Sequence, residues 1–204
     1  TITTAHQPNI FTGPLYFIYK IVHAIKLAAV LKLQLPEHNF VPVYYMGSED
    51  ADLEELGQIT LDGKKIYWKT NQTGAVGRMV VDDNLVKLIH EIKGQIAVNE
   101  YGTELCDLFY RIYSPGKTIQ KATLELVNEL FSKYGLIVLI PDNKVLKSLF
   151  TPIIKKEICD QFSSKILQNT IIELDKNYKV QAKGREINLF YLKDNYRELI
   201  EIQR

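Results

Sequence analysis

The pattern of hydrophobic and polar positions predicts an α/β protein that begins with a strand, a loop and a helix. Residues 1–4 are β-prone and lack Pro and Gly, which predicts a strand. Residues 5–9 are mostly polar and include a proline, so they predict a loop. A long helix is expected to follow, with Pro14 at its first position and Thr12 or Gly13 as its N-cap.

Apolar residues along this helix recur at alternating steps of three and four, as expected of a helix with one buried face. The N-terminus of such a helix leaves backbone N–H groups free beside a partial positive charge, so a nucleotide phosphate is expected to bind near Thr12 and Gly13. The predicted buried stripe consists of Leu15, Ile18, Val22, Ile25 and Ala29.

Two later runs, 40–46 and 136–140, are almost wholly apolar, as in strands that are covered on both faces. A strand, a helix and a strand joined by a crossover of this length are expected to be parallel. The loops after the first two strands should therefore meet at the carboxyl edge of the sheet, where ligands of open α/β sheets bind. The predicted fold is a parallel sheet flanked by helices.

A small insertion is predicted between these two runs, at about residues 57–117. Asp62 and Gly63 lie between two β-prone runs and predict a hairpin. Amphipathic helices are expected over 85–96 and 102–113.

The remainder of the chain is expected to alternate between helices and strands. A helix over 118–133 precedes the second apolar run, and a long helix over 144–167 is expected to kink or break near Pro152. The elements predicted after it are a strand at 179–182, a turn at 183–184, a strand at 187–192 and a charged helix at 194–204.

The composition mainly excludes classes of partner. The chain has 204 residues, of which 46% are hydrophobic, and a net charge of +1, so we expect binding neither to nucleic acid nor to a membrane. Cys106 and Cys159 lie far apart in helix-like stretches, which indicates free thiols in a reducing cytoplasm. The chain does not begin with Met and ends in a helix-like stretch, so we expect it to be part of a longer protein.

Polar residues of the first loop and helix are candidates for substrate or nucleotide binding. His6 could face a phosphate and exchange a proton near neutral pH, with Gln7 and Asn9 beside it. The alternative is that His6 is exposed and that the two amides only satisfy the loop backbone. Tyr16 and Lys20 share a helix face, and Lys20 either neutralises phosphate charge or is simply solvated.

The second loop carries closely spaced carboxylates. Asp52 with Glu55 fits a capping box, so these two residues are expected to be structural. Glu49 and Asp50 precede the cap and could bind a substrate ammonium group, or Mg²⁺ carried by nucleotide phosphates. The histidines have no metal-binding spacing and Cys-x-x-Cys is absent, so no protein-bound zinc is expected.

Four segments, in this order, carry a family resemblance over nearly the whole chain. They are HQPNIFTGPLYFIYK (6–20), VPVYYMGSEDADLEEL (41–56), YGLIVLIPDNKVLKSLFTPI (134–153) and INLFYLKDNYRELIE (187–201). Together they resemble the bacillithiol biosynthesis cysteine-adding enzyme family. The family usually has Gln-Gln where this chain has His6-Gln7, and a histidine where it has Ala51. We hypothesise that His6 replaces that histidine, because the two loops are predicted neighbours.

The resemblance implies a Rossmann-like core related to those of class I aminoacyl-tRNA synthetases and pantoate–β-alanine ligase. It also implies a cytoplasmic ligase that uses ATP, through an acyl-adenylate or acyl-phosphate, to join cysteine to glucosaminyl-malate in the last step of bacillithiol biosynthesis. Family members are longer and form homodimers through a C-terminal coiled coil absent here, so this chain resembles their N-terminal part, and its activity alone stays open.

Two other functions also stay open at this point. The chain could belong to another adenylate-forming ligase or nucleotidyltransferase with the same strand, loop and helix. It could instead be a non-catalytic ligand-binding module, and Ala51 in place of the family's histidine favours this reading.

Overall fold

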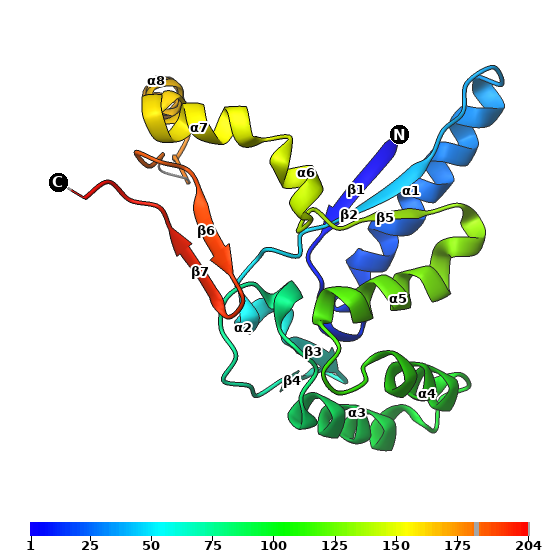
Figure 1. The fold of residues 1–204 in the computed structure, drawn as a ribbon. Helices are drawn as coiled ribbons and strands as arrows, with labels where there is room; N and C mark the ends of the chain where they lie inside the picture. The colour runs from blue at the N-terminus through cyan, green and yellow to red at the C-terminus, as the bar shows by residue number, and fades with distance from the viewer. Residues whose placement is uncertain (182–183, 204) are drawn as a thin grey trace.

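The computed structural model describes residues 1–181 and 184–203 and confirms the predicted α/β class (Figure 1). Three parallel strands form the central sheet in the order β1–β2–β5, with helices beside it. The strands are β1 (Ile2–His6), β2 (Pro42–Met46) and β5 (Ile137–Leu139).

One face of this sheet is buried. Tyr44 and Met46 project from β2 into a hydrophobic cluster and are fully buried there. Helices α1 (Leu15–Gln34) and α5 (Ile119–Phe131) cover this face, and Phe17 of α1 packs edge-on against the Tyr44 ring. Burying a large apolar side chain contributes roughly 1.5–3 kcal/mol, so this cluster fixes the start of α1 on the sheet.

The opposite face of the sheet is partly exposed. Tyr45 retains 38% of its accessible surface and Ile137 retains 54%. The prediction that the runs 40–46 and 136–140 are covered on both faces is therefore wrong for the described residues. The reason is that β5 is an edge strand and that Tyr45 and Leu139 border a cavity.

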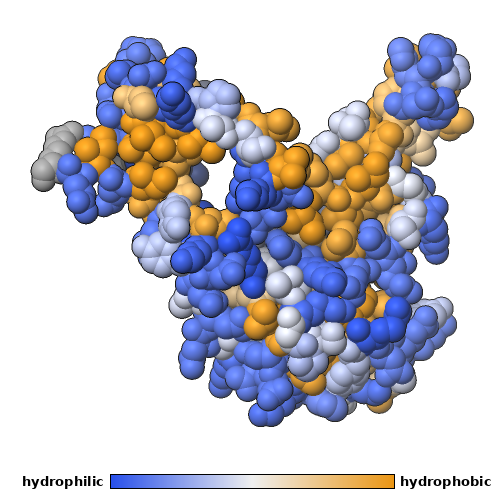
Figure 2. All heavy atoms as spheres, in the orientation of Figure 1, coloured by the Kyte–Doolittle hydropathy of each residue, from blue (hydrophilic) through white to orange (hydrophobic). Residues whose placement is uncertain are grey.

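Helix α1 begins one residue later than predicted and turns another face to the sheet. Pro14 is the N-cap, with an extended backbone, and Leu15 is the first helical residue and is 67% exposed. The predicted stripe is only partly right: Ile18 and Ile25 are partly buried and pack against the cluster, whereas Leu15, Val22 and Ala29 are exposed. Figure 2 shows apolar surface over α1, so periodicity alone does not choose the buried face. The buried face consists of Phe17, Ile21, Ala24 and Ala28.

The segment between β2 and α5 forms a second layer beside the carboxyl edge of the sheet (Figure 1). The structure confirms the predicted hairpin at Asp62-Gly63 and both predicted helices. The elements are α2 (Leu53–Leu56), β3 (Gln58–Leu61), β4 (Lys64–Tyr67), the 3₁₀ helix η2 (Val76–Arg78), α3 (Asp83–Ile96) and α4 (Gly102–Ile112).

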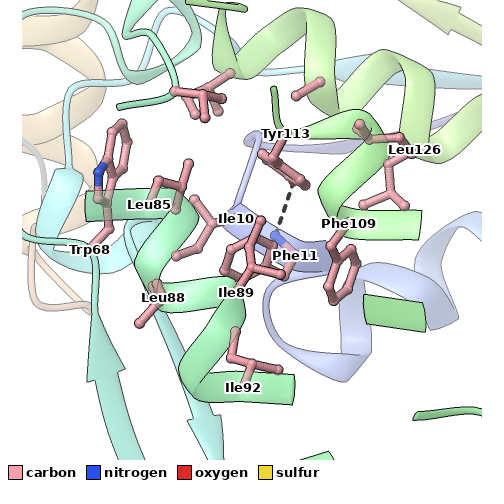
Figure 3. Close-up of a cluster of buried hydrophobic side chains, with 14 of the residues drawn as sticks. Ile10, Phe11, Trp68, Leu85, Leu88, Ile89, Ile92, Phe109, Tyr113 and Leu126 are labelled. Carbon is pink, nitrogen blue, oxygen red and sulfur yellow. Dashed lines mark hydrogen bonds between the residues drawn. The ribbon is translucent and has the colours of Figure 1, made fainter. Parts of the chain in front are cut away.

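A second hydrophobic cluster joins this layer to the loop after β1 (Figure 3). Ile10 and Phe11, from the 3₁₀ helix η1 (Ile10–Thr12), are buried in it. The Phe11 ring lies 5.0 Å from that of Phe109, and the Phe11 N–H donates to the buried Tyr113 hydroxyl at 3.1 Å. The insertion thus holds the bend between β1 and α1 in place.

The C-terminal third differs most from the prediction. The break expected near Pro152 is confirmed, because a new helix begins at Thr151 with this proline in its first turn. A second, unpredicted break occurs at Gln161, which has a left-handed backbone (φ 49°), so the helix expected over 144–167 is three helices. The elements after α5 and before the final strands are the 3₁₀ helix η3 (Ser132–Tyr134), β5, α6 (Lys144–Ser148), α7 (Thr151–Asp160) and α8 (Phe162–Asp175).

The prediction of a charged helix at 194–204 is also wrong. Strands β6 (Phe190–Lys193) and β7 (Tyr196–Leu199) form an antiparallel hairpin instead, and Asn195 takes a positive φ in its turn. Of the strand and turn predicted at 179–184, residues 182 and 183 lie outside the described part, and 179–181 form no strand.

Both cysteines are free thiols, as predicted; Cys106 is buried and Cys159 is exposed. Among the helices of the described residues, none combines the length and apolar character that crossing a bilayer requires.

A buried carboxylate holds the corner between α7 and α8. Glu157 accepts hydrogen bonds from the Ser163 hydroxyl at 2.5 Å, the Ser163 N–H at 3.1 Å and the Asn188 N–H at 3.0 Å. The hydrogen bond from Ser163 holds the pKa of Glu157 below its usual 4.5, against the opposing effect of burial. The ionised form of Glu157 therefore stabilises this corner.

Replacing Glu157 with Gln is expected to destabilise the protein by roughly 1–3 kcal/mol at neutral pH, because the donors lose a charged acceptor. Since the folded-state pKa is depressed, this contribution is present above pH 4.5 and is lost as the pH falls through the lower folded value. Urea unfolding of both proteins between pH 7 and pH 3 measures it. The exposed Asp160→Asn on the same helix is the control, and an equal effect of both variants would contradict the assignment.

Candidate functional site

The loops after β1 and β2 meet at the carboxyl edge of the sheet, as predicted. The Gly47 N–H donates to the His6 carbonyl at 2.8 Å, and the Gln7 amide donates to Asp50 Oδ2 at 3.1 Å. A cavity of about 420 Å³ opens here. Its lining includes His6, Gln7, Tyr45, Glu49, Asp50 and Arg197.

His6 is the last residue of β1 rather than a loop residue. It is only 5% exposed, so the alternative of an exposed histidine is also wrong. The strand extends two residues further than predicted because His6 pairs with Met46 and faces the covered side of the sheet. There its ring lies 5.3 Å from that of Phe17 and 5.0 Å from that of Tyr16.

The hydrogen bonding of His6 defines which nitrogen carries the proton. Nδ1 lies 3.0 Å from the Gln7 carbonyl oxygen, which can only accept, so Nδ1 is the donor. Nε2 is buried and has no hydrogen-bond partner within residues 1–181 and 184–203. Burial lowers the pKa of His6 below 6.5, and the Lys20 charge acts in the same direction. The imidazole is therefore neutral at pH 7, with a free acceptor at Nε2.

Three other residues that were predicted to bind the nucleotide or substrate build the bend between β1 and α1 and do not line the cavity. They are Asn9, Thr12 and Gly13. Asn9 is buried, and a Cβ added to Gly13 would lie 2.4 Å from the Asn9 Cβ. Thr12 and Gly13 both have positive φ, 73° and 53°. Their geometry is that of a tight turn packed on itself, and a nucleotide-binding role for them stays a prediction.

Tyr16 and Lys20 lie next to His6 but also outside the cavity lining. The Lys20 ammonium donates to the Ala5 carbonyl at 3.2 Å and lies 5.1 Å from the centre of the Tyr16 ring. The N-terminus of α1 is thus beside His6, while the exposed Lys20 contacts the edge of β1. Phosphate binding by these two residues stays a prediction.

The two candidate carboxylates already have partners in the protein. Asp50 accepts the Ala51 N–H at 2.7 Å as well as the Gln7 amide, and Glu49 forms an ion pair with Lys147. In the described ranges, no three His, Cys, Asp or Glu side chains are grouped so that they could hold a metal. The arrangement therefore suits a hydrogen-bond donor such as an ammonium group, and magnesium binding stays a prediction.

A charged network beside the cavity was not predicted from the sequence. Asp142 accepts hydrogen bonds from Arg78 at 2.6 and 2.8 Å and from Lys147 at 3.1 Å, and Lys147 also contacts Glu49. The Arg78 guanidinium holds the pKa of Asp142 below its usual range. The position of Asp142 in the sequence could have indicated its role, because Asp142 follows the carboxyl end of β5 just as Glu49 follows that of β2.

Arg197 was missed because its segment was predicted to be helical. It lies on β7, lines the cavity, and places its guanidinium carbon 3.9 Å from the centre of the Phe190 ring.

Comparison with known proteins gives consistent matches. Residues 1–204 match the family model described as "Bacillithiol biosynthesis BshC, N-terminal Rossmann-like domain". Proteins named "Putative cysteine ligase BshC" from Flavobacterium psychrophilum and Flavobacterium johnsoniae are 44% and 42% identical to this chain over 200 residues, 98% of its length. A protein of the same name from Christiangramia forsetii is 38% identical over 205 residues. The chain spans 37%, 37% and 38% of the lengths of these three relatives, respectively.

Proposed function

The chain belongs to the bacillithiol biosynthesis BshC family, and on this premise we propose that it forms part of an ATP-dependent ligase that joins cysteine to the amino group of glucosaminyl-malate. The names of its relatives support a cysteine ligase in bacillithiol biosynthesis. The residue assignment rests on His6, which lines the cavity together with Gln7 and two carboxylates and whose buried Nε2 has no hydrogen-bond partner in the described chain.

The proposed reaction needs an activated carboxylate and a deprotonated amine. ATP supplies the activation when it is bound. The amine nitrogen then bonds to the carbonyl carbon of cysteine, the phosphate-bearing leaving group departs, and the amine gives up a proton. We assign this proton to His6 Nε2, because the proton on Nδ1 is held by the Gln7 carbonyl.

Glu49 and Asp50 are assigned to the substrate ammonium group, which loses its first proton to solvent before the amine attacks; the proton taken by His6 is the second. Both carboxylates line the cavity, and attraction between opposite charges is strengthened where water is partly excluded. Lys147 and Gln7 keep them in place through the contacts described above. Positioning of this kind supplies a large part of the rate enhancement when two substrates are joined.

The N-terminus of α1 is the expected place for the nucleotide phosphates. The helix has 20 residues, so its partial positive charge is fully developed, and Tyr16 of its first turn lies beside His6. No step above depends on magnesium.

Incubating the full-length protein with ATP, cysteine and glucosaminyl-malate is expected to give an amide that contains both organic substrates. Mass spectrometry detects the product, and omitting the aminosugar should abolish it. ATP turnover that does not depend on the aminosugar would indicate another adenylate-forming enzyme. Binding of the substrates without turnover would indicate a non-catalytic module, and either result would overturn the proposal.

A further inference from the structure

The cavity at the carboxyl edge of the sheet is adjacent to a second one. This cavity has a volume of about 560 Å³ and lies between β5, the helices α6 and α7, and the hairpin β6–β7. Its walls are largely apolar, with contributions from Leu139, Phe150 and Leu192. The two cavities share four lining residues, which are Tyr45, Glu49, Pro141 and Arg197.

Arg197 reaches this shared wall because successive side chains of a strand point to opposite faces of the hairpin. Arg197 lies opposite Leu192 in the β6–β7 register, and both line the second cavity. Their neighbours Tyr196 and Glu198 project from the other face of the hairpin and are exposed. The half-buried Arg197 is therefore directed toward the cavities rather than into solvent.

The hairpin is fixed to the insertion at its turn (Figure 1). The Thr73 hydroxyl donates to the Asn195 carbonyl at 2.6 Å, and Arg78 contacts the Asp194 carboxylate at 3.2 Å. Gly74 has a φ of 85°, and a Cβ added to it would lie 2.5 Å from the Tyr196 nitrogen. These contacts hold β7, and with it Arg197, in a defined place.

The charge of Arg197 is not neutralised by the described protein. Arg78 and Lys147 each contact two carboxylates, whereas Arg197 forms no ion pair within residues 1–181 and 184–203. Its guanidinium instead lies over the ring of Phe190. Stacking on an aromatic face leaves the N–H groups at the edge of the guanidinium free for an oxygen-bearing anion.

We propose that Arg197 binds an anionic group of a substrate, a carboxylate or a phosphate, at the wall shared by the two cavities. Glu49 and Asp50 line the same cavity, so the site offers acids for an ammonium group and a guanidinium for an anion. The inference rests on the proposed function for its choice of substrate. Cysteine and glucosaminyl-malate each carry an amine together with carboxylates, and ATP carries phosphates.

The test compares Arg197→Gln, Arg197→Lys and Arg185→Gln in the full-length protein. Arg185 is the matched control, because its guanidinium lies 5.9 Å from the same Phe190 ring but does not line either cavity. Calorimetry gives the Kd for each substrate, and steady-state kinetics give KM and kcat. Arg197→Gln is expected to raise Kd and KM for one anionic substrate by roughly 10- to 100-fold, as for loss of a charged hydrogen bond, with a smaller change in kcat.

The substrate that responds identifies the anion. If Arg197→Gln raises the Kd for glucosaminyl-malate but not the Kd for a glucosaminide that lacks malate, Arg197 binds the malate carboxylates. If the Kd for cysteine rises instead, Arg197 binds the amino-acid carboxylate. If the Kd for ATP rises, Arg197 binds phosphate. Arg197→Lys should recover part of the affinity, because it keeps the charge without the planar fork.

Equal Kd and KM values in Arg197→Gln and Arg185→Gln for all three substrates, with unchanged melting temperatures, would overturn the inference. Failure of the proposed function is distinguishable from this result. In that case the unmodified protein makes no amide product, while the calorimetric comparison of the two arginine variants still decides whether Arg197 binds an anion.

Discussion

Replacing His6 with glutamine is expected to lower the rate of amide formation by roughly 10²- to 10⁴-fold, the usual contribution of a general base. Glutamine keeps a polar group of similar length but cannot take up a proton at Nε2, the atom without a partner in the described chain. The rate of product formation at saturating substrates measures the loss. His23→Gln, an exposed position on α1, is the matched control.

The pH dependence of the same reaction tests the role of His6 separately. Burial lowers the pKa of His6 below 6.5, and a base acts only in its unprotonated form. Activity should therefore be constant with respect to this group above pH 6.5 and fall at lower pH, as the imidazole becomes protonated. The acid limb should disappear in His6→Gln.

Full activity in His6→Gln would end the assignment. Because His6 is buried beside Phe17 and Tyr16, a loss of activity alone could reflect unfolding. Circular dichroism and the melting temperature of the variant are therefore measured together with the rate. A variant that is inactive, folded and still binds the aminosugar supports the chemical role.

Replacing Gly13 with alanine is expected to destabilise the protein by roughly 2–5 kcal/mol. A left-handed backbone costs a non-glycine residue about 1–2 kcal/mol, and forcing an atom into a packed site adds about 1–3 kcal/mol. Both apply here, because Gly13 has a φ of 53° and an added Cβ would lie 2.4 Å from the Asn9 Cβ. The bend that leads from β1 into α1 would have to open.

Gly116→Ala separates the two contributions. Gly116 also has a positive φ, 79°, but an added Cβ meets no atom within 4 Å. Its replacement should therefore show the backbone cost alone, about 1–2 kcal/mol. Urea unfolding of both variants gives the difference. Equal destabilisation would mean that Asn9 yields easily and that the bend is not held by this contact.

The meeting of the two loops could be predicted from sequence because it depends only on connectivity. A crossover helix makes β1 and β2 parallel, and parallel neighbours end at the same edge whatever their side chains. Gln7 and Asp50 accordingly form a hydrogen bond across 43 positions of sequence. The end of β1 could not be placed as well, because the mostly polar segment 5–9 that follows four β-prone residues resembles a loop.

The charged residues of the site were harder to predict. Asp142 and Arg78 are 64 positions apart, and nothing in either local sequence indicates the other. Arg197 follows a two-residue turn, Asp194-Asn195, whose charged surroundings resemble an exposed helix. Its strand becomes recognisable only once Leu192 is seen opposite it. Pairing between distant segments, rather than local preference, decides these positions.

The outer edge of β1 has a consequence for how this sheet meets other chains. The Ile2 N–H and the His6 carbonyl both bond toward β2, so Thr3 and Ala5 direct their backbone groups the other way. Lys20 occupies the Ala5 carbonyl there. A lysine at the open edge of β1 disfavours edge-to-edge aggregation, since an incoming strand must first displace a charged, hydrated side chain.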